Sequence, residues 1–380
     1  MLLDPEAGAI ALAMPPHMEV KARIVNGWYG APSRHVSRWL VSERGSVLRG
    51  ALGFLGADVA LLSLFLLALA TLIRFYGVSF VWAEGPITIS AAIGVGLIVV
   101  HVLLRLPQLL KDGGTALSRL LVTTRELARD WAPFIGLMWA FESLETYTGR
   151  IPKASIDPLL YSLDLRLFGV EPSVWIHAFH HPLLTDWMAF AYGSYFVMPM
   201  IIATALSLRH RRDDFRQLSC AVVIQQGLGL VLCLSFPAGP PRFYRPLLDG
   251  PFQPGTLYSH FGLFEFQQGA FDAADPARTR SAFPSLHCAL ALVTLVYAWR
   301  FGSAISPRRP RLFFWLCLPV VVSLWISTIY LRHHWTVDCA AGLLVGAVAS
   351  FAADWLRAVW PAAAPRFKAA SGETRANLAG

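Results

Sequence analysis

Residues 312–330 read LFFWLCLPVVVSLWISTIY, nineteen consecutive residues without a charged side chain. A helix needs about 20 predominantly apolar residues to cross the hydrocarbon core of a bilayer, which is about 30 Å thick. The stretch therefore predicts a transmembrane helix. Charged residues make up only 15% of the whole chain and apolar residues 55%, whereas soluble domains contain about 25% charged residues. We expect an all-α, polytopic membrane helix bundle.

Similar apolar stretches on both sides of this one bring the predicted number of transmembrane helices to about eight. The third stretch is the weakest, because Glu142 and Glu145 lie inside it. A carboxylate at membrane depth normally faces a polar interior or an aqueous cavity, so this helix either lines a cleft or ends early. Besides residues 312–330, the predicted spans are Leu52 to Ile73, Pro86 to Leu104, Trp131 to Tyr147, Thr185 to Leu208, Leu218 to Phe236, Pro284 to Ala298 and Trp335 to Leu356.

Lysine and arginine collect in alternate connections between these spans, and short connections rich in these residues stay in the cytoplasm. With eight spans, all the basic segments fall on one side together with both termini. We therefore expect the termini to be cytoplasmic, and residues 237–283 and 332–334 to be extracytoplasmic. The basic segments are the N-terminal arm, residues 105–129, 209–216 and 300–311, and the chain after Arg357.

The remaining segments define the predicted domain organisation. Residues 1–49 are expected to form a cytoplasmic arm, either disordered or with a basic helix over residues 37–49 that lies on an anionic leaflet. Residues 50–107 hold two extra N-terminal transmembrane helices. Residues 361–380 are rich in alanine and small polar residues, which predicts a disordered cytoplasmic tail.

The cysteines and the net charge indicate neither a metal site nor a nucleic-acid partner. All five cysteines lie within or at the edge of apolar spans, where cysteine acts as a small apolar residue. Their spacings are not those of zinc ligands. The net charge of +8 is explained by the basic cytoplasmic connections. We expect no disulfide, no metal and no nucleic acid, and membrane lipids as the surroundings.

Two histidine motifs open predicted spans at the same membrane face. One reads FPSLH and ends at His287, and the other, residues 333–338, reads HHWTVD. His334 and Asp338 are four residues apart, so on a helix they share one face and the carboxylate can bond an imidazole nitrogen. His333 should point elsewhere. A polar bridge at a helix end is the ordinary alternative, but the second motif at the same face favours a catalytic site.

Pro284 and Ser285 come shortly before His287 in the first motif. A proline near a helix start leaves backbone N–H groups unpaired, and these groups form an anion site together with the helix dipole. Two histidines, a carboxylate and an anion site at one membrane face indicate a phosphate ligand.

Both motifs resemble those of the type 2 phosphatidic acid phosphatase (PAP2) superfamily. One superfamily motif contains Pro-Ser-x-His, as at residues 284–287, and another ends in His-x-x-x-Asp, as at residues 334–338. The preceding Tyr330-Leu331 and the second histidine make the latter similar to the Aur1-like inositol phosphotransferases, or inositol phosphorylceramide synthases, in particular. The resemblance implies a six-helix catalytic domain at residues 131–357.

The resemblance also implies roles for the side chains. His334 would attack the phosphorus of a lipid phosphoester, Asp338 would orient His334 and stabilise the resulting cation, and His287 would protonate the departing oxygen. The phosphohistidine would then be attacked by an acceptor that His287 activates. No metal or cofactor is needed.

Residues 235–246 resemble the first motif of the superfamily, which implies that Arg242 or Arg245 binds the phosphate. Ser285 is a further candidate through its hydroxyl and the neighbouring N–H groups. For either arginine, an interfacial side chain bound to lipid head groups is the alternative.

Two departures from the phosphatase pattern bear on the reaction. Lipid phosphatases of the superfamily usually have a lysine where this chain has Ala238 and an arginine where it has Thr328. A phosphomonoester dianion needs more positive charge than a phosphodiester, so these losses favour a diester donor and transfer to an alcohol. Arg242 or Arg332 could compensate for them.

The expected function is that of an integral-membrane phosphotransferase in a bacterial plasma membrane, with an extracytoplasmic active site. It would move a phospho-head-group such as phosphoinositol from a phospholipid donor to a lipid or alcohol acceptor. A PAP2-type lipid phosphate or pyrophosphate phosphatase is the alternative. A transporter is a third class, but its polar residues would lie near the bilayer midplane in repeated halves, whereas here they lie at helix ends.

Two further groups of residues have both an ordinary and a functional interpretation. Residues 156–172, Tyr192 and Tyr195 resemble segments of the same subgroup, although a turn and packed tyrosines would explain them equally well. Three histidines near the outer interface are unevenly spaced and lack a carboxylate partner, so we expect them to be surface side chains. They are His177, His180 and His181.

Overall fold

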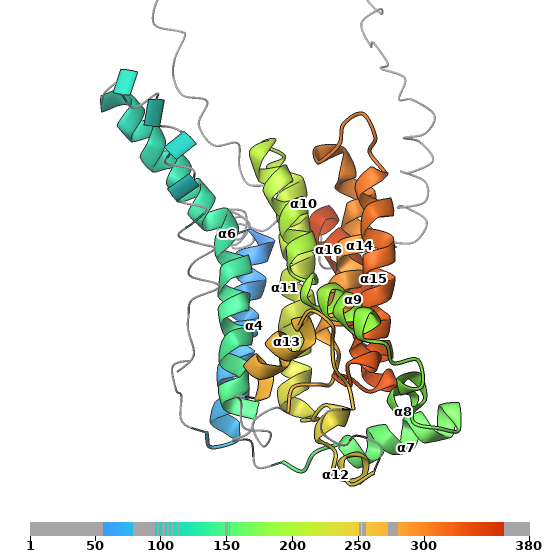
Figure 1. Ribbon diagram of the computed structural model, residues 1–380. Helices are drawn as coiled ribbons and strands as arrows, with labels where there is room; N and C mark the ends of the chain where they lie inside the picture. Colours follow the sequence, from blue (N-terminus) through green and yellow to red (C-terminus); the bar gives the residue numbers. More distant parts are fainter. Residues whose placement is uncertain are drawn as a thin grey trace, which may run out of the picture. The chain divides into compact units, whose positions relative to one another are not determined.

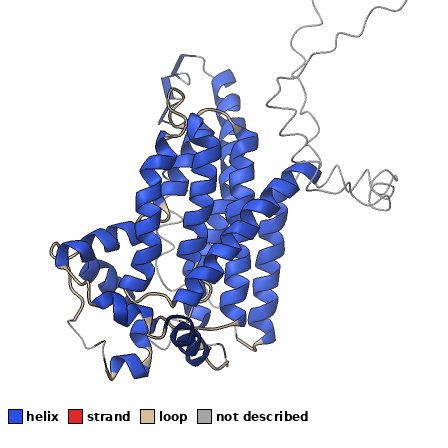
Figure 2. Cartoon of the chain, turned by 90° about the vertical axis from the view of Figure 1, so that its right-hand side faces the viewer, coloured by secondary structure: helices blue, strands red, loops and turns tan. Residues whose placement is uncertain are grey.

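The structure of the chain is a computed structural model that describes residues 56–78, 114–148, 153–250, 256–272 and 280–360, with residues 151 and 252 and scattered residues between 96 and 111. These belong to one compact unit. The described residues form helices, turns and loops without a strand (Figure 2), and one isolated bridge joins Ala238 to Ser281. The predicted all-α class is confirmed. The predictions for residues 1–49 and 361–380 lie outside the described residues.

The helices are named here as they are labelled in Figure 1, and two short 3-10 helices, η1 and η2, accompany them. In chain order they are α4 (Ala57–Phe75), α6 (Gly114–Thr148), α7 (Asp157–Phe168), α8 (Pro172–His177), α9 (Pro182–Gly193), α10 (Val197–Leu208), α11 (Arg212–Ser235), η1 (Pro241–Phe243), α12 (Arg245–Leu248), α13 (Leu263–Asp272), α14 (Leu286–Phe301), η2 (Gly302–Ala304), α15 (Leu312–Tyr330) and α16 (Thr336–Val359).

Within the described residues, five helices are long and apolar enough to cross a membrane. They are α4, α11, α14 with its η2 extension, α15 and α16. Helices α9 and α10 qualify as a sixth span when taken together, bent by 40°. These six coincide with six of the predicted spans, and α15 has the predicted bounds. The expected polytopic helix bundle is confirmed.

The two other predicted spans have different outcomes. Trp131 to Tyr147 lies within α6, a 35-residue helix with Pro133 in its interior, which is not among the helices apolar enough to qualify. The charged residues that α6 carries lower its apolar content, as Glu142 and Glu145 suggested. Pro86 to Leu104 lies mostly outside the described residues.

Helix α11 lies at the centre of the bundle and packs against α4, α6, α14 and α16. Of its membrane-spanning residues 78% are buried inside the protein, compared with 11% of those in α4. Helix α4 therefore presents most of its surface outward, as expected for an apolar helix at the periphery of a membrane bundle.

Helices α14 and α16 approach each other closely because two glycines of α16 face α14. A Cβ atom on Gly342 would lie 2.2 Å from the carbonyl oxygen of Ser285, and one on Gly346 would lie 2.5 Å from that of Ala289. Small residues four apart allow this kind of backbone contact between membrane helices. The contact aligns the start of α14, which carries His287, with the start of α16, which carries Asp338.

The two ends of the bundle differ in character. Helices α7, α8 and α12 gather at the end where α11 and α15 finish and α14 and α16 begin (Figure 1). The opposite end is held by arginine–carboxylate pairs between neighbouring helices and turns. These pairs are Arg216 with Asp58, Arg212 with Asp130, Arg300 with Asp354, and Arg357 with Asp214.

Candidate active site

His287 and His334 lie side by side at the end of the bundle that α7, α8 and α12 cover. The Nε2 atom of His334 is 3.4 Å from the Nδ1 atom of His287. His287 lies in the first turn of α14, and His334 lies in the turn between α15 and α16. Both side chains are buried. The two motifs, which are separated by about fifty residues, therefore meet in one site.

The orientation of His334 differs from that expected from helical spacing. Helix α16 begins only at Thr336, with Trp335 as its N-cap, so His334 precedes the helix. The Nδ1 atom of His334 lies 2.9 Å from the carbonyl oxygen of Ala282 and 3.7 Å from Oδ2 of Asp338. The direct hydrogen bond predicted between His334 and Asp338 is thus replaced by a bond to the backbone.

This bond fixes the tautomer of neutral His334. A carbonyl oxygen can only accept, so Nδ1 carries the proton and Nε2 has the free electron pair. Nε2 is the nitrogen that faces His287. The arrangement therefore presents a nucleophilic nitrogen to the space beside the second histidine.

Asp338 is completely buried and joins the two helix starts. Its Oδ2 atom accepts a hydrogen bond from the Trp335 amide at 3.1 Å, and its backbone carbonyl accepts one from the Ser285 amide at 3.1 Å. Its Oδ1 atom has no hydrogen-bond partner among the described residues. A buried carboxylate 3.7 Å from an imidazole favours a positive charge on that imidazole.

Ser285 is the N-cap of α14, and its Oγ atom accepts a hydrogen bond from the Cys288 amide at 3.3 Å. Because the Ser285 and Cys288 amides both have partners within the protein, they are not open to a bound anion as the sequence suggested. An anion at this helix start would therefore have to bind amides other than these two.

A cavity of about 50 Å³ opens beside the two histidines. Arg242 lines it from η1 and is buried, whereas Arg245 is exposed at the start of α12 and is not among the lining residues. His333 also lines the cavity, although helical spacing suggested that it points away. The lining residues are Phe141, Tyr192, Pro240, Arg242, Ser281, Ala282, Leu286, His287, His333 and His334.

Two tyrosines of the α9–α10 segment hold the histidine rings. The Tyr192 ring stacks on His287 with centroids 4.2 Å apart and on His333 with centroids 4.4 Å apart. The Tyr195 ring lies 4.1 Å from that of His287. The sequence offered these tyrosines only through the family resemblance, because their contact with the histidines joins segments about a hundred residues apart.

The environment of His333 keeps it neutral. Burial lowers the pKa of His333 well below its usual value, and the nearby positive charge of Arg242 acts in the same direction, as do His334 and His287. Arg242 is the lysine or arginine among the described residues that line this cavity.

The two positions where a phosphatase would usually carry a cation are buried and neutral. Ala238 is fully buried and bridges to Ser281. Thr328 is fully buried, and its hydroxyl lies 2.7 Å from the Trp325 carbonyl oxygen and 3.0 Å from the Cys339 sulfur. Because both side chains are fully buried, a long charged side chain at either position would have to displace its neighbours.

The three outer histidines have different environments. His177 lies 3.1 Å from a guanidinium nitrogen of Arg332 through its Nδ1 atom, and His180 lies 3.1 Å from the Tyr258 carbonyl oxygen through Nε2. His181 is the N-cap residue of α9. His177 is thus part of a polar cluster and not an isolated surface side chain.

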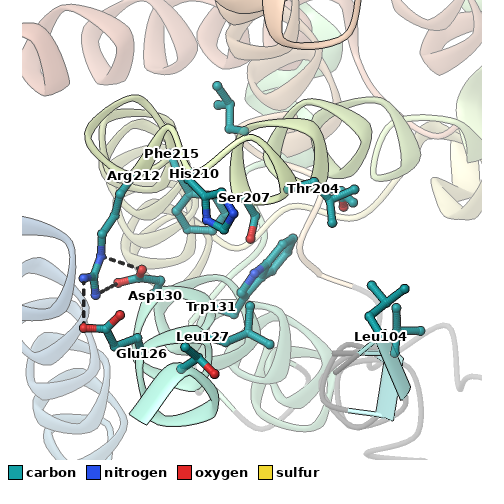
Figure 3. A pocket seen from close by; sticks show the side chains of 14 residues that line it. Leu104, Glu126, Leu127, Asp130, Trp131, Thr204, Ser207, His210, Arg212 and Phe215 are labelled. Carbon is teal, nitrogen blue, oxygen red and sulfur yellow. Dashed lines mark hydrogen bonds and ion pairs between the residues drawn. The ribbon is translucent and has the colours of Figure 1, made fainter. Parts of the chain in front are cut away.

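A larger cavity, of about 550 Å³, lies at the opposite end of the bundle between α6, α10 and α11 (Figure 3). Arg212 extends along its edge toward Asp130 and Glu126, with ion-pair distances of 2.7 and 3.5 Å. Its lining contains neither His287 nor His334. The larger cavity is therefore separate from the histidine site.

Comparison with known proteins connects this geometry to a family. A profile of the PAP2 superfamily matches residues 159–353 of the chain, just over half of its length, and this range includes both histidine motifs and Arg242. The chain is also similar to a phosphoinositol dihydroceramide synthase of Bacteroides thetaiotaomicron, with 25% identity over 240 residues, which cover 58% of this chain and 74% of the relative. No solved structure matches the chain.

Proposed function

The chain belongs to the PAP2 superfamily, and we propose that it is a phosphotransferase that moves a phospho-head-group, such as phosphoinositol, between lipids. The family and the similar synthase support an integral-membrane enzyme that acts on lipid phosphates. One observation above all supports transfer through His334. The Nδ1 atom of His334 is held by the Ala282 carbonyl, while its Nε2 atom faces His287 at 3.4 Å.

In the first step, Nε2 of His334 attacks the phosphorus of the donor phosphodiester. The bond from phosphorus to the lipid oxygen breaks, and His287 gives a proton to that oxygen. The phosphorylated His334 carries a positive charge, which the Asp338 carboxylate 3.7 Å away stabilises. Nδ1 keeps its proton throughout, because the Ala282 carbonyl binds it.

In the second step, a hydroxyl of the acceptor lipid replaces the donor. His287, now unprotonated, takes the proton from this hydroxyl as its oxygen attacks phosphorus. The bond between phosphorus and Nε2 breaks, which regenerates His334 and completes the transfer. Tyr192 and Tyr195 keep the His287 ring in place through both proton transfers.

The charge around the cavity supports a diester donor. A phosphodiester carries one negative charge, and one arginine, Arg242, lines the cavity. A guanidinium can bind two phosphate oxygens at once. The buried neutral residues Ala238 and Thr328 add no positive charge, so a phosphomonoester dianion would be less well balanced. The similar protein of Bacteroides thetaiotaomicron is named a phosphoinositol dihydroceramide synthase, and a phosphoinositol group agrees with this donor class.

We place the active site on the extracytoplasmic side of the membrane, with both termini in the cytoplasm. The arginines at the opposite end of the bundle support this orientation, because basic residues beside short connections stay in the cytoplasm. A cysteine introduced at the exposed His260, on the side of the histidine site, should react with an impermeant thiol reagent from outside the cell. Reaction only from inside would reverse the orientation.

The reaction is tested with purified protein and phosphatidylinositol labelled in the head group. With a lipid alcohol present, the label should appear in a new lipid, and H334A should abolish this product while the protein remains folded in detergent. Hydrolysis of phosphatidic acid without any transfer product would instead support the PAP2-type phosphatase. Transfer by H334A would exclude His334 as the nucleophile.

A further inference from the structure

Arg332 is a buried cation with no carboxylate oxygen within 4.0 Å among the described residues, although the Glu171 carboxylate is near enough to act on its charge. Only 6% of its surface is exposed. Its two terminal nitrogens each lie 3.2 Å from Thr256 Oγ1, and one lies 3.1 Å from His177 Nδ1. Its Nε atom has no hydrogen-bond partner in the described part of the chain. None of the ion pairs within 4.0 Å that join described residues includes Arg332.

Burial of a charge without a carboxylate in direct contact is unfavourable, and proteins normally pair such a charge or bind an ion with it. Burial lowers the pKa of Arg332 to about 10, so the guanidinium still carries its charge at neutral pH. The backbone of Arg332 has a φ of 62°, a left-handed conformation that favours glycine over a long side chain. A buried charge and a strained backbone conformation both reduce the stability of the fold, and residues of this kind cluster at binding sites.

Arg332 and Arg242 face different parts of the site. The backbone of Arg332 is fixed to that of Arg242, whose amide donates to the Arg332 carbonyl at 3.3 Å. Arg242 lines the cavity beside His334, whereas Arg332 does not line it and contacts Thr256 and His177. The two guanidinium groups thus provide two positive charges with different neighbours.

His177 completes the environment as a neutral acceptor. Burial and the charge of Arg332 lower the pKa of His177, so its Nδ1 atom accepts a hydrogen bond from Arg332. Thr256 likewise accepts through its hydroxyl oxygen. The guanidinium also lies over the Phe252 ring, 4.0 Å from its centroid. These three uncharged neighbours orient the guanidinium without neutralising its charge.

We propose that Arg332, His177 and Thr256 form a second anion-binding site, which holds a second phosphate or carboxylate group of the lipid head group whose phosphodiester lies at Arg242 and His334. This proposal rests on the proposed function, since it takes the phosphodiester to lie beside His334. It defines the substrate class as a lipid whose polar head carries an additional oxyanion.

Binding of two soluble head groups tests the proposal without any need for turnover. Glycerophosphoinositol has one phosphodiester, and glycerophosphoinositol with one additional ring phosphate has a second anion. Each is titrated into the purified full-length protein in detergent. The wild-type protein should bind the second compound about tenfold more tightly or better, as expected of a charge-assisted contact. In R332N the ratio of the two affinities should decrease to about twofold or less.

Two variants give the matched controls. Asparagine tolerates the left-handed backbone of residue 332, and thermal unfolding in detergent shows whether R332N is folded. R332K keeps the positive charge, so it should keep a large part of the preference for the compound with the additional phosphate. R245N, which removes an exposed arginine at the same end of the protein, should keep all of it.

Three outcomes would overturn the proposal. The wild type could bind both compounds equally, R332N could weaken both compounds equally, or inorganic phosphate alone could bind at Arg332 with the affinity of the second compound. The last result would assign the site to free phosphate and not to a head group. Because none of these measurements involves transfer, an enzyme that hydrolyses its substrate would still show the predicted ratio. Failure of the proposed transferase activity is therefore a separate result.

Discussion

Asp164 caps the helix that begins two residues after His334, through an Oδ2 atom that lies 2.8 Å from the Thr336 amide nitrogen. Its Oδ1 atom accepts a second bond, from the Val337 amide at 3.2 Å. Asp164 lies in α7, far from α16 in the sequence. The covering helix therefore holds the start of α16, and with it the turn that carries His334.

We predict that D164A lowers both stability and activity. Loss of a side chain that caps a helix costs about 0.5–2 kcal/mol, and the freed turn should lower kcat more than it raises KM. D164N keeps one acceptor oxygen and should give intermediate values. Thermal unfolding in detergent and steady-state kinetics measure the two effects, with D249A, at an exposed carboxylate of the same end, as control. Equal effects of D164A and D249A would contradict this role.

The arginine closest to the reacting groups should be Arg242. R242Q should lower kcat/KM by about 10²-fold or more, which is the usual loss when one donor to a reacting oxyanion is removed. R242K keeps the charge but loses the planar fork, so its activity should lie between those of R242Q and the wild type. R245Q should remain within about threefold of the wild type, as is usual for exposed side chains. If R245Q and R242Q lost activity equally, the choice between the two arginines would be wrong.

The sequence predicted the helices well where the signal was local. Residues 312–330 form a helix with the predicted bounds because an uncharged apolar stretch of this length has few other stable structures in a membrane. The two motifs also lie at the same end of the bundle, since each directly precedes or opens an apolar helix. For α6 the signal was mixed, because charged residues and an apolar segment share one long helix.

The contacts of His334 could not be predicted from its own motif. Helical spacing assigned its partner to Asp338, but α16 starts after His334, and the Asp338 carboxylate turns back to the Trp335 amide. The atom that binds His334 Nδ1 is the carbonyl oxygen of Ala282, 52 residues away. The stacking of Tyr192 on His287 and His333 also depends on the tertiary fold. Local periodicity holds no information about such contacts.

Close packing of α14 against α16 should be needed for activity. In G346A the new Cβ atom would meet the Ala289 carbonyl oxygen at 2.5 Å, and because this is a backbone atom the helices must move apart. We expect a destabilisation of about 1–3 kcal/mol, as for other overpacked sites. We also expect kcat to decrease, because the movement of the helices would separate His287 from Asp338. L344A, at an exposed leucine of the same helix, should change stability by about 0.5 kcal/mol or less. A fully active, stable G346A would show that this contact is dispensable.

The cluster of His177 and Arg332 predicts a loss of stability in mild acid. Burial, and then the charge of Arg332, lower the pKa of His177 below its ordinary value, so the unfolded chain takes up a proton more readily than the folded protein. The stability that neutral His177 contributes is present above about pH 6.5, the value in unfolded chains, and is lost as the pH falls through the folded pKa. Thermal unfolding should therefore show a wild-type midpoint that decreases between about pH 7.5 and about pH 5.5, the range in which histidine usually titrates. H177N retains an acceptor for Arg332 but does not titrate, so its midpoint should decrease less, whereas H260N, at an exposed histidine, should follow the wild type. If H177N and the wild type lost stability in parallel, the lowered pKa would belong to another group.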